Sequence, residues 1–142
     1  MSTFRIQYGA LPYTFVEGQA VVLLATSRDT RRWIIPKGWP MKGKSPHQTA
    51  AREAFEEAGI KGDIGRIPVG SYEYGKRLRD GAVVLCRVEV FPLRVTEQRR
   101  RWPEYHQRET AWFSLEDAAS SVQEGDLAAL ILGFRTTLAE AA

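Results

Sequence analysis

Residues 38–60 read GWPMKGKSPHQTAAREAFEEAGI, and the second half of this stretch predicts a helix with both ends marked. Ser45 is a hydroxyl N-cap, Pro46 takes the first helical position, and Gln48 completes a capping box three residues after the cap. Gly59 provides a C-terminal stop. The expected helix therefore covers residues 46–58, and these limits fix where its side chains can point.

Two faces of this helix differ in chemistry. Apolar residues recur at i, i+3, i+4 and i+7, which predicts a stripe that faces the core: Ala51, Ala54, Phe55 and Ala58. Three carboxylates fall on roughly the opposite side: Glu53, Glu56 and Glu57. They are either a solvated acidic face, with Arg52 pairing with Glu56 and Lys61 with Glu57, or the hard oxygen ligands of a divalent cation.

Around the helix, apolar periodicity predicts short strands. They are expected at 18–27 and 33–38, once or twice within 61–75, at 81–95 with a bend near Pro92, and in the TAWFSL stretch after residue 109. Residues 98–109 are a polar loop, and residues 115–142 are a loop followed by a C-terminal helix. Since no repeat or linker interrupts the chain, we expect a single α/β domain over residues 1–142, a sandwich with a mixed sheet.

Composition narrows the class of protein. The chain has 142 residues, a net charge of +3 and one cysteine, Cys86, which lies within an apolar run and is expected to be a buried structural thiol. The sequence MSTFRIQYGALPYTF lacks the pattern of a signal peptide, and no run approaches the ~20 apolar residues of a membrane helix. We expect a cytoplasmic protein without a membrane partner.

Residues 38–60 also resemble the Nudix box, a pattern of glycine, five residues, glutamate, seven residues, and then Arg-Glu-apolar-any-Glu-Glu-any-Gly-apolar. Eight of its nine specified positions match: Gly38, Arg52, Glu53, Ala54, Glu56, Glu57, Gly59 and Ile60. The exception is Lys44, which stands where the pattern has glutamate. The segments SRDTRRWIIPKG, VGSYEYGK and RETAWFSLEDA look most like the branch that cleaves diphosphoinositol polyphosphates and diadenosine polyphosphates.

This resemblance implies a Nudix-type α/β/α sandwich and a metal-dependent hydrolase that cleaves a phosphoanhydride bond in a polyphosphorylated small molecule. Glu56, Glu57 and the carbonyl of Gly38 would bind Mg²⁺ or Mn²⁺. Glu53 would be a further ligand or the base that activates water, with Arg52 as its orienting partner. Two carboxylates outside the box are alternative bases: Glu104 and Glu109.

Basic residues gather in three loops and could contact the phosphates of such a substrate. The expected substrate-binding residues are Lys37, Lys42, Lys44, Arg77 and Arg79, and further basic residues follow at Lys76 and at 99–101. Lys44, which stands where the family pattern has a carboxylate, would contact a phosphate of the substrate.

Two other classes of function remain open. A Nudix fold could serve as a ligand sensor without catalysis, which the departure at Lys44 favours. Alternatively, basic stretches with aromatic residues, such as RRRWPEYH, could bind nucleic acid, although three carboxylates near the contact surface argue against this. The sequence leaves the exact substrate undefined, and it is compatible with a monomer or a homodimer.

Overall fold

The computed structural model describes residues 4–141. Residues 1–3 and 142, which belong to the expected domain, lie outside the described residues. Its strands are β1 (Arg5–Val16), β2 (Gln19–Thr26), β3 (Trp33–Ile34), β4 (Lys37–Gly38), β5 (Ile60–Ile64), β6 (Gly70–Arg77), β7 (Val83–Gln98) and β8 (Thr110–Ser114). Its helices are α1 (Pro46–Ala58), α2 (Leu115–Ser121), α3 (Gly125–Leu132) and α4 (Phe134–Ala141).

The strands form one mixed sheet around two long central strands, β1 and β7. These two run parallel, with Arg5 opposite Cys86 and Tyr13 opposite Arg94, whereas the other strand pairings within residues 4–141 are antiparallel. An isolated parallel bridge also joins Trp33 to Val122. β2 and β4 pair with β1, β3 and β8 pair with β2, and β5 and β6 follow one another along β7. The mixed sheet was expected from the sequence and is confirmed.

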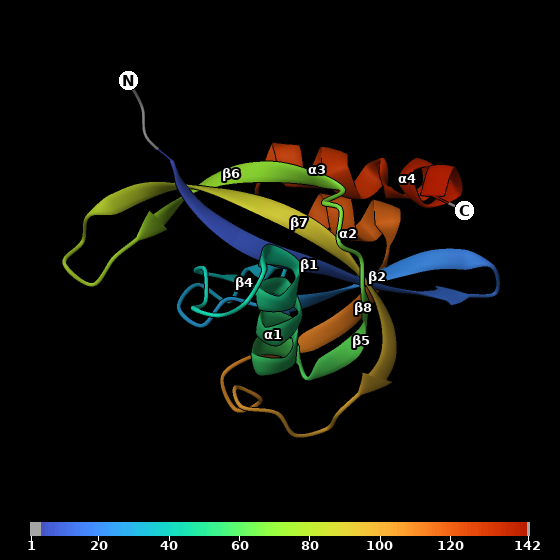
Figure 1. The fold of residues 1–142 in the computed structure, drawn as a ribbon, viewed down its shortest axis with the longest axis horizontal. Helices are drawn as coiled ribbons and strands as arrows, with labels where there is room; N and C mark the ends of the chain where they lie inside the picture. Colours follow the sequence, from blue (N-terminus) through green and yellow to red (C-terminus); the bar gives the residue numbers. More distant parts are fainter. Residues whose placement is uncertain (1–3, 142) are drawn as a thin grey trace.

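Helices cover both faces of the sheet (Figure 1). β2 shows why, because both of its faces are buried: Leu23 packs in the cluster beneath α1, and Leu24 packs in the cluster with α2 and α3. Successive strand residues point to opposite faces, so a continuous apolar run requires a layer on each side. The α/β/α sandwich is therefore confirmed.

Pro92 lies inside β7, a central strand, where a missing N–H would normally break the ladder. It sits at the junction between the two partners on one edge of β7, since β6 pairs as far as Val90 and β5 begins to pair at Leu93. Its carbonyl accepts the Gly65 N–H at 2.8 Å. The expected bend thus corresponds to a change of partner within one strand of 16 residues.

Some elements differ from the sequence-based expectation. β1 was not predicted, although it lies at the centre of the sheet. The expected strand at 33–38 is divided into β3 and β4, and the expected C-terminal helix is three helices, α2 to α4. Cys86 is fully buried, as expected. No helix within residues 4–141 is both long and apolar enough to cross a membrane.

Candidate active site

Helix α1 begins and ends where the sequence predicts, but the face it buries is rotated. Gln48 Oε1 accepts the Ser45 N–H at 2.9 Å, and Gly59 ends the helix in the left-handed conformation, with φ 69°. The residues that face the sheet are Ala50, Ala54 and Ala58, each fully buried, together with Thr49. Small side chains four residues apart let the helix approach the strands closely.

The prediction that Phe55 packs into the core is therefore wrong. Phe55 is only partly buried, and three cations surround its ring: Arg52, Lys61 and Arg99, at 5.0–5.4 Å from the centroid. Rotation of the helix also brings Glu57 inward, to 5% exposure. The three glutamates consequently lie beside the core and not on a fully solvated face.

The polar loop after β7 is attached to the C-terminal end of α1, where helix carbonyls lack partners within the helix. The indole N–H of Trp102 donates to the Glu57 carbonyl at 3.0 Å, and the Glu104 N–H donates to the Glu56 carbonyl at 3.1 Å. A Cβ atom on Gly59 would lie 2.7 Å from the Trp102 ring, so only glycine fits there. This attachment brings the loop's own side chains to Glu57.

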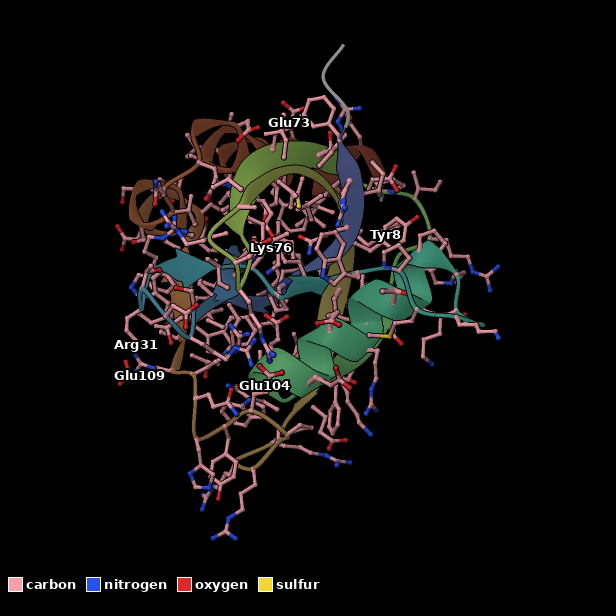
Figure 2. The ribbon with its side chains drawn as sticks, turned by 90° about the vertical axis from the view of Figure 1, so that its left-hand side faces the viewer. Tyr8, Arg31, Glu73, Lys76, Glu104 and Glu109 are labelled. Atoms are coloured by element: carbon pink, nitrogen blue, oxygen red, sulfur yellow. The ribbon has the colours of Figure 1, made fainter. Side chains whose placement is uncertain are left out.

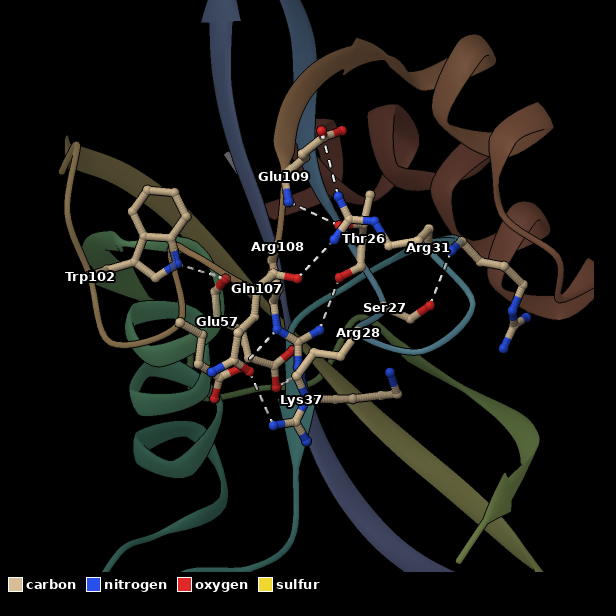
Figure 3. Close-up of polar contacts among 12 residues, drawn as sticks. Thr26, Ser27, Arg28, Arg31, Lys37, Glu57, Trp102, Gln107, Arg108 and Glu109 are labelled. Atoms are coloured by element: carbon tan, nitrogen blue, oxygen red, sulfur yellow. Dashed lines mark hydrogen bonds and ion pairs between the residues drawn. The ribbon is translucent and has the colours of Figure 1, made fainter.

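Arg108 is the loop residue that reaches furthest into the site (Figure 3). Its side chain is 8% exposed, and its guanidinium lies 3.6 Å from Glu57 Oε1 and 2.8 Å from Glu104 Oε1. It also donates to the Thr26 carbonyl at 3.0 Å. Arg108 therefore joins α1, the loop and the end of β2 through one buried cation.

Glu53 lies against Gly38 and beside Glu57. A Cβ atom on Gly38 would approach the Glu53 carboxylate to 2.4 Å, so the glycine leaves the space that this carboxylate fills. Burial raises the pKa of Glu53 to about 9, and hydrogen bonding to Glu57 and the charges of Glu57, Glu56 and Glu104 add to the effect. The carboxyl group of Glu53 therefore favours its protonated form at neutral pH in the metal-free protein.

The three glutamates line a cleft with a volume of about 740 Å³. Several of the predicted site residues line it: Lys37, Gly38, Glu53, Glu56, Glu57, Lys76, Arg77 and Glu104. Lys37 lies 5.0 Å from the ring centroid of Tyr74, and burial lowers the pKa of Lys37 while the charges of Glu57 and Glu124 oppose that shift. In Figure 2, Lys76 and Glu104 lie on the side of the molecule that faces the viewer, as does helix α1.

Other predicted residues lie outside this cleft. Glu109 is 73% exposed and forms an ion pair with Arg31 at 3.5 Å, at the edge of the molecule (Figure 2). Arg52 pairs with Glu56 at 2.9 Å and not with Glu53. Arg52 and Lys44 both line a separate depression. The remaining exposed basic residues do not line the cleft: Lys42, Arg79, Arg99, Arg100 and Arg101.

The cleft also contains cations that sequence reasoning missed, Arg28, Arg32 and Arg108. The stretch SRDTRR contributed to the resemblance to a Nudix branch but was assigned no binding role, and the cluster of arginines within it was the available signal. Together, six basic and six acidic side chains line the cleft. A bound divalent cation would therefore give it a net positive charge.

Most acidic groups of the cleft are already held by arginine. Glu57 and Glu104 face Arg108, Glu56 faces Arg52, and Glu124 faces Arg32. Within residues 4–141, no group of three or more His, Cys, Asp or Glu side chains is arranged to hold a metal ion. The neighbouring carboxyl groups of Glu53 and Glu57, however, offer hard oxygen atoms of the kind that Mg²⁺ and Mn²⁺ prefer.

The fold and the cleft define a class: an α/β/α sandwich whose loop–helix segment carries a carboxylate site in a charged cleft. A family model, the NUDIX domain, matches residues 5–131, and the chain belongs to that family. The expected class of enzyme, a Nudix pyrophosphohydrolase, is confirmed by this match and by the hydrolases among the relatives.

Comparison with curated proteins supports the branch suggested by the sequence. The chain is 36% identical over 122 residues to "Diphosphoinositol polyphosphate phosphohydrolase 3-alpha" of Mus musculus, an alignment that covers 84% of this chain and 70% of that protein. It is 29% identical over 133 residues to "Nudix hydrolase 12, mitochondrial" of Arabidopsis thaliana, covering 82% and 66%. The chain thus spans about two thirds of the length of these relatives.

Solved structures share the fold. A C. elegans Ap4A hydrolase in a binary complex superimposes with a TM-score of 0.71 and 23% identity, covering 96% of this chain and 98% of that one. The NUDIX domain of Shewanella oneidensis NrtR, bound to ADP ribose, gives a TM-score of 0.71 with 18% identity, covering 97% and 90%. At these identities, the likeness concerns the fold.

Proposed function

We propose that this protein hydrolyses a phosphoanhydride bond in a small polyphosphorylated molecule, a diphosphoinositol polyphosphate or a diadenosine polyphosphate, with Mg²⁺ or Mn²⁺. The observation that carries the proposal is the pair of neighbouring carboxyl groups, Glu53 and Glu57, facing a cleft that also contains six basic side chains. The diphosphoinositol relatives support this class of substrate. The cytoplasmic location expected from the sequence is kept as part of the proposal.

A divalent cation fits the carboxylates of the cleft. Glu56, Glu57 and the carbonyl of Gly38 would hold it, with Glu53 as a further ligand once its proton is lost. Glu57 would then exchange its contact with Arg108 for the metal. When bound, the metal would neutralise charge on the phosphate oxygens and lower the pKa of a water molecule.

Two carboxylates of the cleft could accept the proton of the attacking water. Glu53 would accept a proton only once a bound cation has lowered its raised pKa, and it sits among the proposed metal ligands. Glu104 lies outside the Nudix box and is 25% exposed, with Arg108 on one side. Arg108 would fix the orientation of Glu104 in either case.

The phosphates of the substrate would meet the basic side chains that line the cleft. Arg28, Arg32, Lys76 and Arg77 lie along its wall, and Lys37 sits beside Glu57. Arginine suits this role because its planar fork matches phosphate oxygens. Lys37 and Arg77 keep the substrate-binding role proposed from the sequence. We do not propose that role for Lys42, Lys44 and Arg79, because they do not line the cleft.

The sensor alternative rests on Lys44 alone, and Lys44 lies outside the cleft, so its replacement of a glutamate leaves the three carboxylates of the cleft in place. The nucleic-acid alternative has weaker support, because half of the charged side chains in the cleft are acidic. Hydrolysis is the function that these observations favour.

The test is a hydrolysis assay with diadenosine and diphosphoinositol polyphosphates in the presence of Mg²⁺, Mn²⁺ or EDTA, with product identification. We expect metal-dependent release of a phosphorylated product from at least one of these substrate classes. Stable binding of both, without turnover under any metal condition, would favour the sensor.

A further inference from the structure

A second depression, of about 520 Å³, lies along a different face of α1 from the active-site cleft. Its walls are the loop before α1, the outer face of the helix and strand β5, with Leu93 of β7 below. The geometry points to a second, non-catalytic site here, which binds a nucleotide. This inference is independent of the hydrolysis reaction.

The charge of the depression differs from that of the active-site cleft. Lys44, Arg52 and Lys61 line it, and none of its lining residues is acidic. Lys44 and Lys61 form no ion pair within residues 4–141. Because no acidic side chain lines the depression and only Arg52 of the three cations has an ion-pair partner, the depression favours an anion even without a metal.

Two acidic groups beside the depression, Glu97 and Glu56, are already paired with arginine. Glu97 lies opposite Lys61 in the pairing of β5 with β7, but it forms an ion pair with Arg99 at 2.5 Å. Glu56 pairs with Arg52 across one helical turn, and both side chains are partly exposed. An exposed pair of this kind contributes little to stability, so Arg52 can turn to a phosphate at small cost.

The floor of the depression is apolar, which distinguishes a nucleotide from a simple anion. Ala51, Phe55, Ile60, Ile64 and Leu93 form it, and Phe55 is only partly buried, with Arg52 and Lys61 beside its ring. Inorganic phosphate would use only the cationic rim. A nucleotide would use both parts, with its phosphates at the lysines and its base against the apolar floor, and the volume is in the usual range for small-ligand pockets, roughly 300–1,000 Å³.

Lys44 contributes one of the three positive charges of this site. The Nudix pattern has glutamate at this position, and a carboxylate there would leave the lining with a single excess cation instead of three. The replacement of glutamate by Lys44 therefore changes the charge of this depression and not that of the active-site cleft. Lys44 therefore adds to the preference for anions that Arg52 and Lys61 give to the depression.

The experiment is titration of the full-length protein with ADP in EDTA, followed by amide NMR and calorimetry. With Glu53 protonated, the metal-free cleft has at most one excess positive charge, against three cations and no acidic group in the lining of the depression. We therefore expect the largest shifts at Gly43, Lys61 and Gly62 in the depression and small shifts at Gly38 and Gly75 in the cleft. ADP should bind more tightly than inorganic phosphate, and adenosine should bind weakly.

Lys44→Glu should weaken ADP binding by about tenfold, the loss of one charge-assisted contact. Lys42→Glu is the matched control, since Lys42 is exposed on the same loop but does not line the depression. The inference is wrong if both variants weaken ADP equally, if phosphate binds as well as ADP, or if the shifts occur only at Gly38 and Gly75. Because turnover is not measured, inactivity toward every substrate would leave this result unaffected.

Discussion

The guanidinium of Arg108 lies 3.6 Å from the carboxylate of Glu57, and each of these side chains is less than a tenth exposed. The two residues are far apart in the sequence, one in the proposed metal-binding helix and the other just before β8. Since Arg108 also holds Glu104 and the end of β2, this buried ion pair joins the parts of the site.

The first prediction concerns this pair. Arg108→Met leaves two carboxylates and the Thr26 carbonyl without their donor, so we expect the free energy of unfolding to fall by about 3 kcal/mol. Urea denaturation of the metal-free protein measures it. Arg101→Met, at an exposed position of the same loop, should stay within about 0.5 kcal/mol of the wild type. A comparable small loss for Arg108→Met would show that the pair is not structural.

The second prediction concerns Gly38. In Gly38→Ala the new methyl group must displace the Glu53 carboxylate, which lies 2.4 Å from the ideal Cβ position. We expect Mg²⁺ affinity, measured by calorimetry, to fall by about tenfold or more. The control is Gly125→Ala, where a Cβ atom meets nothing within 4 Å. Unchanged affinity in Gly38→Ala would mean that Glu53 does not have to stay beside Gly38 to bind the metal.

The third prediction concerns pH. The pKa of Glu53 in the folded, metal-free protein is about 9, against an ordinary value of 4.5, so the folded state binds the extra proton between these values. The stability that this proton confers is therefore present at low pH and is lost as the pH rises toward 9. In EDTA, the wild-type Tm should fall across this interval more steeply than that of Glu53→Gln.

Metal binding gives an independent check of the same pKa. Since a ligand must be deprotonated, Mg²⁺ should displace a proton from Glu53 at pH 7, and calorimetry in buffers of different ionisation enthalpy measures that release. Parallel pH profiles for the wild type and Glu53→Gln, with no proton release, would contradict the assignment.

The fourth prediction separates the two carboxylates proposed outside the Nudix box. Glu104 lines the cleft, whereas Glu109 is exposed and paired with Arg31. Glu104→Gln should lower kcat by about a hundredfold if Glu104 is the base, and by less if it only positions water or Arg108. Glu109→Gln should keep kcat within about twofold of the wild type in the same assay. A larger effect for Glu109→Gln would reverse the assignment.

Much of the site could be predicted because its signals are local. The limits of α1 follow from Ser45, Pro46 and Gly59, all within or beside the helix, and the three glutamates lie within five positions. Likewise, the run 81–95 is apolar enough to predict a buried strand. Neighbouring residues determine these features, so the sequence reveals them.

What could not be predicted depends on distant residues. Both Phe55 and the small alanines fit a helical stripe, and only the sheet beneath α1 selects Ala50, Ala54 and Ala58 for the close contact. β1 contains Gly9 and Pro12 and shows no clear alternation, so its central position comes from its pairing with β7, about 80 residues away. Arg108 reaches Glu57 only after this sheet has formed.

The central claim is that Glu57 holds a divalent cation on which hydrolysis depends, and Glu57→Gln tests it most directly. The amide keeps the shape of the side chain but removes the charge. We expect kcat/KM for the best polyphosphate substrate to fall by more than about a hundredfold. Loss of a residue that only hydrogen-bonds to a metal ligand typically costs about 10- to 100-fold, and loss of a ligand itself should cost more. The stabilisation of the protein by Mg²⁺ should be lost as well, while the metal-free protein remains folded. Wild-type turnover by a folded Glu57→Gln variant, with the Mg²⁺-dependent rise in Tm intact, would contradict the claim.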